Sequence, residues 1–84
     1  MPDMSETETA AQMIEALTRA AREAVGAETP LVSVTMEFLR EGAPASVSAE
    51  ISRRTRTLVF AVVEAKAADG TRIATASSVH KIRS

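Results

Sequence analysis

The sequence of 84 residues predicts an α+β domain, in which one N-terminal helix is wrapped by a four-stranded antiparallel sheet. Between about residues 6 and 25, apolar residues recur at helical spacing, whereas the later part of the chain alternates or runs apolar in the way typical of strands. Asp69-Gly70 stands between two strand-like runs and is typical of a hairpin turn whose two central residues have positive φ. We expect a single domain over residues 1–84, with strands at about 31–40, 45–54, 57–67 and 71–82.

The predicted helix begins at a capping box formed by Ser5 and Glu8 and ends at Gly26. One narrow, alanine-rich apolar stripe follows this helix, which suits packing close against a sheet. The stripe consists of Ala10, Ile14, Leu17, Ala21 and Ala24, with Met13, Ala20 and Val25 on its flanks. Met13 and Met36 are expected to fill the core.

The strands are predicted to be covered to different extents. Residues 31–40 and 46–54 alternate between apolar and polar side chains, which indicates strands with one buried face. On the first of them, the apolar face consists of Val32, Val34, Met36 and Phe38. The run Leu58–Val63 is apolar at nearly every position, which predicts a central strand covered on both faces, with Phe60 buried in it.

Composition narrows the possible functions. A core this small, with two phenylalanines and no cysteine, indicates stabilisation by self-association. A net charge of −1 without tryptophan or tyrosine argues against nucleic-acid binding. No apolar run has the length of a membrane span and the first residues lack a basic leader, so we expect a cytoplasmic protein that binds no membrane. No metal site is expected, because His80 is the one histidine.

Three segments of the strand half follow one another in a familiar order. The first is Met36–Arg40 with the Gly/Pro break behind it, the second is Ser52–Leu58, and the third is Asp69–Ser77. They resemble, respectively, the Phe-Leu-Arg-Pro segment, the arginine-rich segment and the Asp-Gly hairpin of hotdog-fold acyl-CoA thioesterases of the phenylacetate-degradation type. Thr55 stands where glycine is usual in the second segment. The resemblance covers about residues 10–82 and implies a hotdog fold shortened at the N-terminus.

The resemblance also implies a mode of assembly and a reaction. Family members form homodimers or tetramers by pairing the strand after the helix with its two-fold mate, and the acyl-CoA lies at the dimer interface. Coenzyme A enters only as part of the substrate, so no separate cofactor is expected. Backbone amides at the helix N-terminus polarise the thioester carbonyl. The His-Gly-Gly motif that often opens this helix is absent here, where Glu6-Thr7-Glu8 stands in its place.

The resemblance assigns catalytic roles to a few positions. Glu15 stands where the family's helix carboxylate acts as general base or nucleophile, and Gln12, one turn earlier, is a candidate for orienting the substrate. Ser33 and Thr35 occupy the strand whose hydroxyl holds the attacking water in relatives. The structural alternatives are a solvated helix glutamate and an ordinary half-exposed strand.

Arg53, Arg54 and Arg56 are candidates for binding the phosphates of coenzyme A through charge-assisted, bidentate contacts. A solvated turn explains three arginines nearly as well. His80, near the end of the last strand, is expected at a surface or an interface.

Three functions therefore remain open. The first is an acyl-CoA thioesterase, and the second is a non-catalytic hotdog module that binds an acyl-CoA or a protein. The third is a cystatin-like binding protein, also built from a helix and a curved sheet. Hydrolysis assays separate the first two, and strand order separates the third, because a cystatin sheet is a meander whereas a hotdog sheet places its last strand between two earlier ones.

Overall fold

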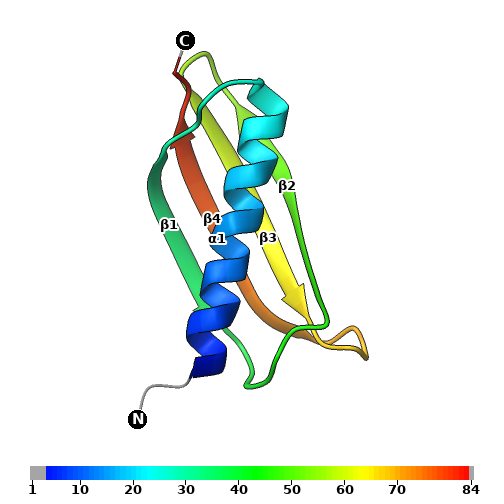
Figure 1. The fold of residues 1–84 in the computed structure, drawn as a ribbon. Helices are drawn as coiled ribbons and strands as arrows, with labels where there is room; N and C mark the ends of the chain where they lie inside the picture. The colour runs from blue at the N-terminus through cyan, green and yellow to red at the C-terminus, as the bar shows by residue number, and fades with distance from the viewer. Residues whose placement is uncertain (1–3, 84) are drawn as a thin grey trace.

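The computed structural model describes residues 4–83 as one helix packed against one four-stranded sheet (Figure 1). The helix and all four predicted strands are present, and each boundary lies within about two residues of its expected position. The side chain of Ser5, on which the predicted capping box depends, lies outside the described side chains. The elements are α1 (Met4–Val25), β1 (Leu31–Phe38), β2 (Ser46–Arg54), β3 (Leu58–Lys66) and β4 (Arg72–Lys81).

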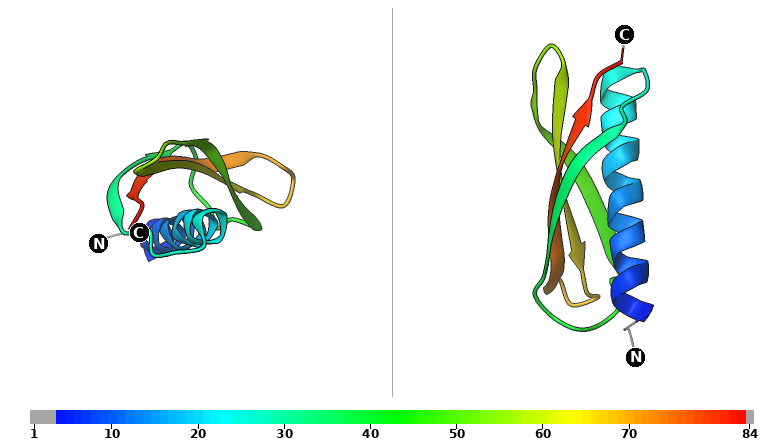
Figure 2. Two further views of the ribbon diagram at one scale, coloured as in Figure 1. Left: turned by 90° about the horizontal axis from the view of Figure 1, so that it is seen from above. Right: turned by 90° about the vertical axis from the view of Figure 1, so that its left-hand side faces the viewer.

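The strands are arranged in the order β1-β4-β3-β2, and every neighbouring pair is antiparallel. The last strand thus lies between β1 and β3, as expected of a hotdog sheet, and this order excludes the meander of a cystatin-like protein. β3 is a central strand as predicted, while β1 and β2 form the two edges. Figure 2 shows the sheet curving over α1, which covers its inner face alone.

The helix contacts the sheet through residues spaced four apart, namely Thr9, Met13, Leu17 and Ala21, of which none is more than 2% exposed. The predicted stripe is therefore misplaced. Met13, predicted on its flank, lies within the observed line of contact, whereas Ala24, predicted in the stripe, is exposed. A four-residue spacing drifts slowly around a helix of 3.6 residues per turn. The line of contact can consequently follow the twist of the sheet.

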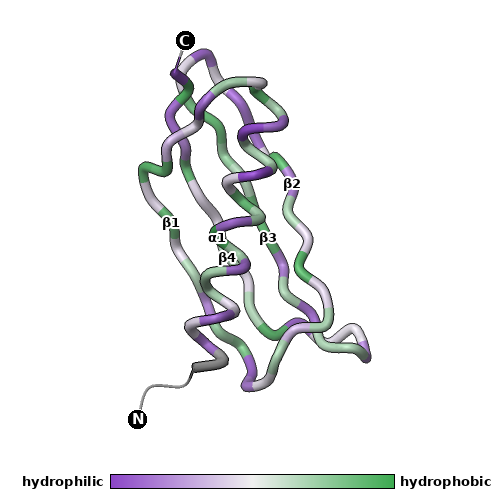
Figure 3. Tube along the Cα trace, in the orientation of Figure 1, coloured by the Kyte–Doolittle hydropathy of each residue, from purple (hydrophilic) through white to green (hydrophobic). Residues whose placement is uncertain are grey.

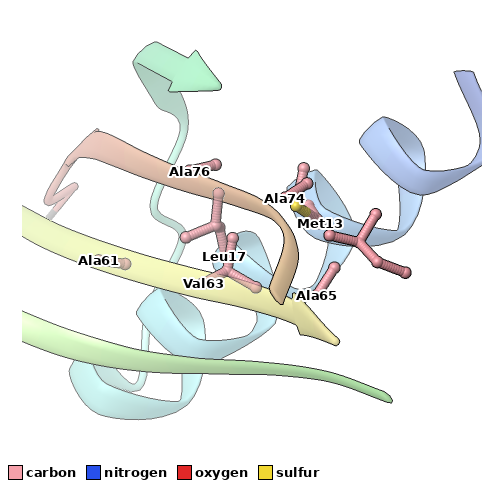
Figure 4. Close-up of a cluster of buried hydrophobic side chains, with 8 residues drawn as sticks. Met13, Leu17, Ala61, Val63, Ala65, Ala74 and Ala76 are labelled. Carbon is pink, nitrogen blue, oxygen red and sulfur yellow. The ribbon is translucent and has the colours of Figure 1, made fainter. Parts of the chain in front are cut away.

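Small side chains on the sheet allow this close approach. The buried cluster around Met13 and Leu17 is completed from β3 and β4 mainly by alanines (Figure 4), and Val34 and Met36 of β1 pack against its margin. The sheet residues in the cluster are Ala61, Val63, Ala65, Ile73, Ala74 and Ala76. Met13 fills the core as expected, whereas Met36 is only partly buried and packs against its margin.

The central strand β3 is covered on one face only. Its burial alternates strictly: Val59 and Val63 are buried toward α1, whereas Leu58, Phe60 and Val62 are half-buried on the outer face. Figure 3 shows β3 as hydrophobic over much of its length, so hydropathy does not alternate there although burial does. The prediction that both faces are covered is therefore wrong within one chain. The continuous apolar run therefore marks a strand that is paired with a neighbour on each side. It does not mark a strand with a covering layer on each face.

The turn between β3 and β4 is of a different type from the one predicted. Gly70 has a φ of 87°, but no non-glycine residue in the described chain has positive φ, so Asp69 does not. The Gly70 amide donates to the Ala67 carbonyl oxygen at 2.9 Å, which makes a three-residue loop that ends in a left-handed glycine. Hydrogen bonds from the hydroxyl and amide of Thr71 lower the pKa of the Asp69 carboxyl.

His80 is fully buried, so the expectation that it lies at a surface is wrong for this chain. Its Nδ1 lies 3.2 Å from the carbonyl oxygen of Thr29, and its Nε2 lies 2.8 Å from Oγ of Ser78. A carbonyl oxygen only accepts, so Nδ1 carries the proton and Nε2 accepts from the serine hydroxyl. This pair of bonds ties the segment after α1 to β4.

Candidate functional site

Glu15 and Gln12 lie on the outer face of α1, directed away from the sheet. The Glu15 side chain is 71% exposed, and its Oε1 accepts a hydrogen bond from the Arg19 guanidinium at 2.9 Å. This is an ordinary ion pair across one helical turn. One chain by itself therefore leaves the candidate carboxylate in solvent.

Ser33 and Thr35 lie on the outer face of the sheet. Ser33 pairs with Val79, whereas the intervening Val34 points inward and packs against the core. Because α1 covers the inner face, the sheet separates these hydroxyls from Glu15. A site that uses both groups therefore cannot form within one chain.

A β-bulge in β2 determines where the arginines point. The register between β2 and β3 shifts between Ile51 and Arg53, so that Ser52 is the extra residue and Arg53 lies opposite Phe60. The Ser52 hydroxyl donates to the Phe60 carbonyl oxygen at 3.2 Å. In a regular ladder Ser52 would oppose Phe60, and Arg53 would face α1. The bulge therefore directs Arg53 to the outer face.

The candidate phosphate-binding arginines consequently diverge. Arg54 lies opposite Val59 on the inner face, where its Nη1 donates to the Ala24 carbonyl oxygen at 3.0 Å. It thus satisfies one of the last carbonyls of α1, which ends as predicted at Gly26. The Arg53 guanidinium instead lies 5.9 Å from the centroid of the Phe60 ring, at the outer limit of a cation–π contact.

The turn that carries Arg56 is held by Thr55. The Thr55 Oγ1 accepts a hydrogen bond from the Leu58 amide at 3.0 Å, and the Thr55 amide donates to the Leu58 carbonyl oxygen at 2.8 Å. Thr55 does not have positive φ. A threonine is therefore compatible with this turn, where the resemblance would place glycine.

The surface has a hollow of about 320 Å³ beside the start of α1. Its walls combine apolar side chains from the end of β1 with polar groups from α1 and from the loop after β1. They are formed by Glu6, Thr9, Phe38, Leu39, Arg40, Glu41, Gly42 and Ile73. A hollow with both apolar and polar walls next to a helix N-terminus suits a ligand that has an apolar part and a polarisable carbonyl.

A second hollow, of about 580 Å³, lies on the outer face of the sheet and is lined by carboxylates and hydroxyls. The strand order brings Glu37, Glu50 and Glu64 onto this face from three different strands. Glu64 is paired with Lys66 at 3.5 Å and with Arg72 at 3.9 Å. Nothing in the sequence predicts this hollow, because its residues meet only through the order of the strands.

The described residues offer no metal site, no membrane-spanning helix and no accessible nucleophile–base pair. They contain no group of three or more side chains that could hold a metal ion, and none of their helices is long and apolar enough to cross a membrane. Ser78 and His80 have the hydrogen bond of a nucleophile–base pair, but both are buried beneath α1 and no substrate reaches them.

Neither a family model nor a curated protein matches this sequence. Three solved structures resemble its fold. The BH2602 protein of Bacillus halodurans, crystallised with CoA, superposes with a TM-score of 0.81 at 11% identity over 89% of this chain. A protein from the thioesterase superfamily superposes with a TM-score of 0.69 at 16% identity over 79% of this chain. A protein of Chromobacterium violaceum superposes with a TM-score of 0.73 at 19% identity over 87% of this chain.

These likenesses and the strand order establish that the chain has the hotdog fold. One helix lies against a four-stranded antiparallel sheet in which the last strand separates β1 from β3. The chain spans 56%, 52% and 57% of the lengths of the three proteins, a little more than half of each.

Proposed function

We propose that this chain is a thioesterase-like hotdog protein that binds and hydrolyses an acyl-CoA thioester between two copies of itself. The observation that carries the proposal is the β1-β4-β3-β2 sheet wrapped around α1, which this chain shares with a protein crystallised with CoA.

The apolar edge strand supports association of two copies. In the described chain, the exposed large hydrophobic residues all lie in β1 or directly after it: Leu31 is 41% exposed, Val32 60%, Phe38 39% and Leu39 51%. An edge strand with apolar side chains and unpaired backbone groups favours pairing with another strand. Two copies of β1 related by a two-fold axis would form one continuous antiparallel sheet.

Within such a dimer, each candidate residue has a defined task. The hollow beside the start of α1 in one copy receives the acyl group and the thioester carbonyl. Gln12 and Glu15 do not line that hollow in their own chain, so the other copy contributes them, and Gln12 orients the substrate. Glu15 acts as general base: water adds to the carbonyl carbon, the carboxylate takes the proton, the carbon–sulfur bond breaks and the thiol leaves. The resemblance alone assigns Ser33 to the water, because sheets joined through β1 keep both outer faces on the side away from both helices.

A non-catalytic acyl-CoA-binding module is the second candidate, and one specific observation favours it. Glu6, which stands where the family often has His-Gly-Gly, is a wall of the hollow beside the helix start. A carboxylate at that point opposes the negative charge that develops on the thioester oxygen during hydrolysis. Binding does not require that charge to develop.

Release of free thiol from short-chain, long-chain and aromatic acyl-CoAs distinguishes the two candidates. For a thioesterase, Glu15→Gln should lower kcat by about 10²–10⁴-fold while binding is largely retained. Glu23→Gln, a second exposed glutamate of α1, is the matched control and should leave kcat unchanged. Turnover that survives Glu15→Gln refutes the role of Glu15. Binding without turnover selects the binding module. If the protein shows neither binding nor turnover, both candidates are refuted.

A further inference from the structure

The side chains of β1 and of the residue after it follow a palindromic order of polarity. Outward from Thr35 in either direction, an apolar residue comes first, then a polar residue, and then two apolar residues. The order is Leu31, Val32, Ser33, Val34, Thr35, Met36, Glu37, Phe38 and Leu39. Its two apolar ends are also the large hydrophobic side chains that the described chain exposes. This edge therefore presents the same pattern of polarity whichever way it is read.

A two-fold axis restricts how two copies of this edge can pair. Residues that face each other across an antiparallel pair have their side chains on the same face of the sheet. Val34 packs against the core, whereas its neighbours Ser33 and Thr35 lie on the outer face. An axis between two residues would set an inner residue opposite an outer one, so the axis must pass through a residue. Near the middle of β1, that residue is Val34, Thr35 or Met36.

An axis through Thr35 matches the polarity of the two copies along the whole strand. Val34 then lies opposite the partner's Met36. Farther out, the register shift in β1 leaves residues 31–32 together facing residues 38–39 of the partner subunit. Apolar side chains that face each other across a strand pair stabilise the pair, and here they do so at both ends of the interface.

An axis through either neighbouring residue loses this match. With the axis on Val34, residues 31–32 face the partner's Glu37, and with the axis on Met36 they face the partner's Arg40. A charged group that loses water against apolar side chains, without gaining an opposite charge, costs free energy. Only the first axis places apolar side chains opposite apolar ones at both ends.

The ends of this interface lie beside the candidate site. Phe38, which lines the hollow beside the start of α1, is opposite the buried Ala74, so its side chain lies on the inner side of the sheet. Leu31 is opposite the buried His80 and lies on the same side. In the register centred on Thr35, Leu31 of the partner subunit therefore adjoins the apolar wall of the hollow.

We infer that two copies pair through β1 with their two-fold axis on Thr35, and that Leu31 and Val32 of the partner subunit complete the apolar wall of the hollow. The inference rests on the proposed function for the dimer, and it adds the register and the partner residues that contact the acyl group. An acyl chain bound there contacts both copies, so ligand binding and pairing of the copies stabilise each other.

Cysteine cross-linking tests the register, because the chain contains no cysteine. A residue on the axis faces its own copy at a Cα distance of about 5 Å, which a disulfide can span. Under mild oxidation, we expect Thr35→Cys to form a disulfide-linked dimer about tenfold faster than Ser33→Cys or Glu37→Cys alone. Those two controls lie on the same face, but in this register each is about 14 Å from its own copy. Mixed together, they should link to each other as fast as Thr35→Cys does.

The outcomes separate the register from the dimer itself. Faster linkage of Val34→Cys or Met36→Cys than of Thr35→Cys places the axis elsewhere and overturns the register, while the proposed dimer stands. A wild-type dimer in light scattering whose variants link at none of these positions overturns pairing through β1. In denaturant, all variants should link at one slow rate, which measures random collision.

A second measurement tests the partner's contribution to the hollow. In the dimer cross-linked at Thr35→Cys, Leu31→Trp should fill part of the space for the acyl group and weaken acyl-CoA binding about tenfold in titration calorimetry. Ala68→Trp, in the exposed turn between β3 and β4, is the matched control and should leave the affinity unchanged. Unchanged affinity of Leu31→Trp overturns the role of the partner residues. If wild-type protein binds no acyl-CoA while Thr35→Cys links as expected, the proposed function fails and the register stands.

Discussion

The two edges of the sheet, β1 and β2, face water with different side chains. Both present one row of backbone groups that no strand in this chain pairs with. The side chains that β1 and the residue after it expose include Leu31, Val32, Phe38 and Leu39. The exposed residues of β2 are serines, a glutamate and arginines, while Val47, Ala49 and Ile51 pack against the core.

This difference separates an edge protected for exposure to solvent from an edge with the apolar character that the proposed dimer requires. Natural sheets protect free edges with charges and bulges, and β2 has both, in Glu50, its arginines and the bulge at Ser52. β1 also has a register shift, between Leu31 and Ser33, but the residue there is the 60% exposed Val32. The same structural device therefore exposes a polar residue on one edge and an apolar residue on the other.

The largest effect is expected from placing charges on the apolar edge. The double substitution Val32→Lys, Leu39→Lys should weaken self-association by about 100-fold or more, because it sets like charges against each other across the two-fold axis. Light scattering coupled to size exclusion at micromolar concentration measures the mass. Lysines at Ser46 and Ser48 of β2 are the matched control and should leave the mass unchanged. A well-folded wild-type monomer would contradict the proposed dimer.

The two edges should respond differently to truncation of an apolar side chain. Ile51→Ala on β2 should lower the free energy of unfolding by about 2 kcal/mol, since Ile51 packs against the core. Val32→Ala on β1 should cost less than about 0.5 kcal/mol in a dilute monomer and more as the dimer forms. Denaturant unfolding at several protein concentrations measures both. A cost for Val32→Ala that does not change with concentration would argue against β1 as the interface.

Phe60 next to the β2 bulge should contribute less than a fully buried ring. A buried phenylalanine costs about 3–5 kcal/mol when it is replaced by alanine, but Phe60 is half-buried, so we expect about 1–2 kcal/mol for Phe60→Ala. Thermal melting gives the value, with Ser77→Ala on the same face as the control. A loss as large as that of a buried ring would mean that another layer covers this face in solution.

The smallest effect is expected at the turn between β3 and β4, which belongs to neither edge strand. Hydrogen bonds from Thr71 lower the pKa of Asp69 in the folded state. Its stabilising effect is therefore present above the unfolded carboxyl pKa, about 3.9, and is lost as the pH falls through the lower folded value. Asp69→Asn should remove this contribution, so the gap in melting temperature between variant and wild type should close on acidification. A gap that is the same at neutral and low pH would show that the carboxylate charge is not involved.

The sequence predicts the features that depend on local periodicity. The helix, the four strands and the central position of β3 follow from spacing and from the apolar run Leu58–Val63. It could not predict features that arise only when strands pair. The bulge at Ser52 is one of them: it directs Arg53 and Arg54, which the sequence predicts to bind the same phosphates, to opposite faces of the sheet. Catalytic roles for Glu15, Gln12 and Ser33 remain predictions, because one chain keeps the helix and strand residues on opposite sides of the sheet.

Burial was mispredicted where a polar residue lies at a core position. Thr9 is nearly fully buried, so the true contact line of α1 begins with a residue that a search for apolar spacing leaves out. His80 is buried because Ser78 and the Thr29 carbonyl satisfy both ring nitrogens. Neither hydrogen bond has a signature in the sequence.

The strand order also sets the sequence of events in folding. β2, β3 and β4 pair with their neighbours in the chain, and these local hairpins require only short loops to close. β1 pairs with β4, so its hydrogen bonds can form only when the last strand is present, after a loop of more than thirty residues has closed. During synthesis, β1 leaves the ribosome before its partner exists. The most apolar edge of the protein is thus exposed longest while the chain is incomplete, which makes Leu31–Leu39 the segment most in need of protection by chaperones.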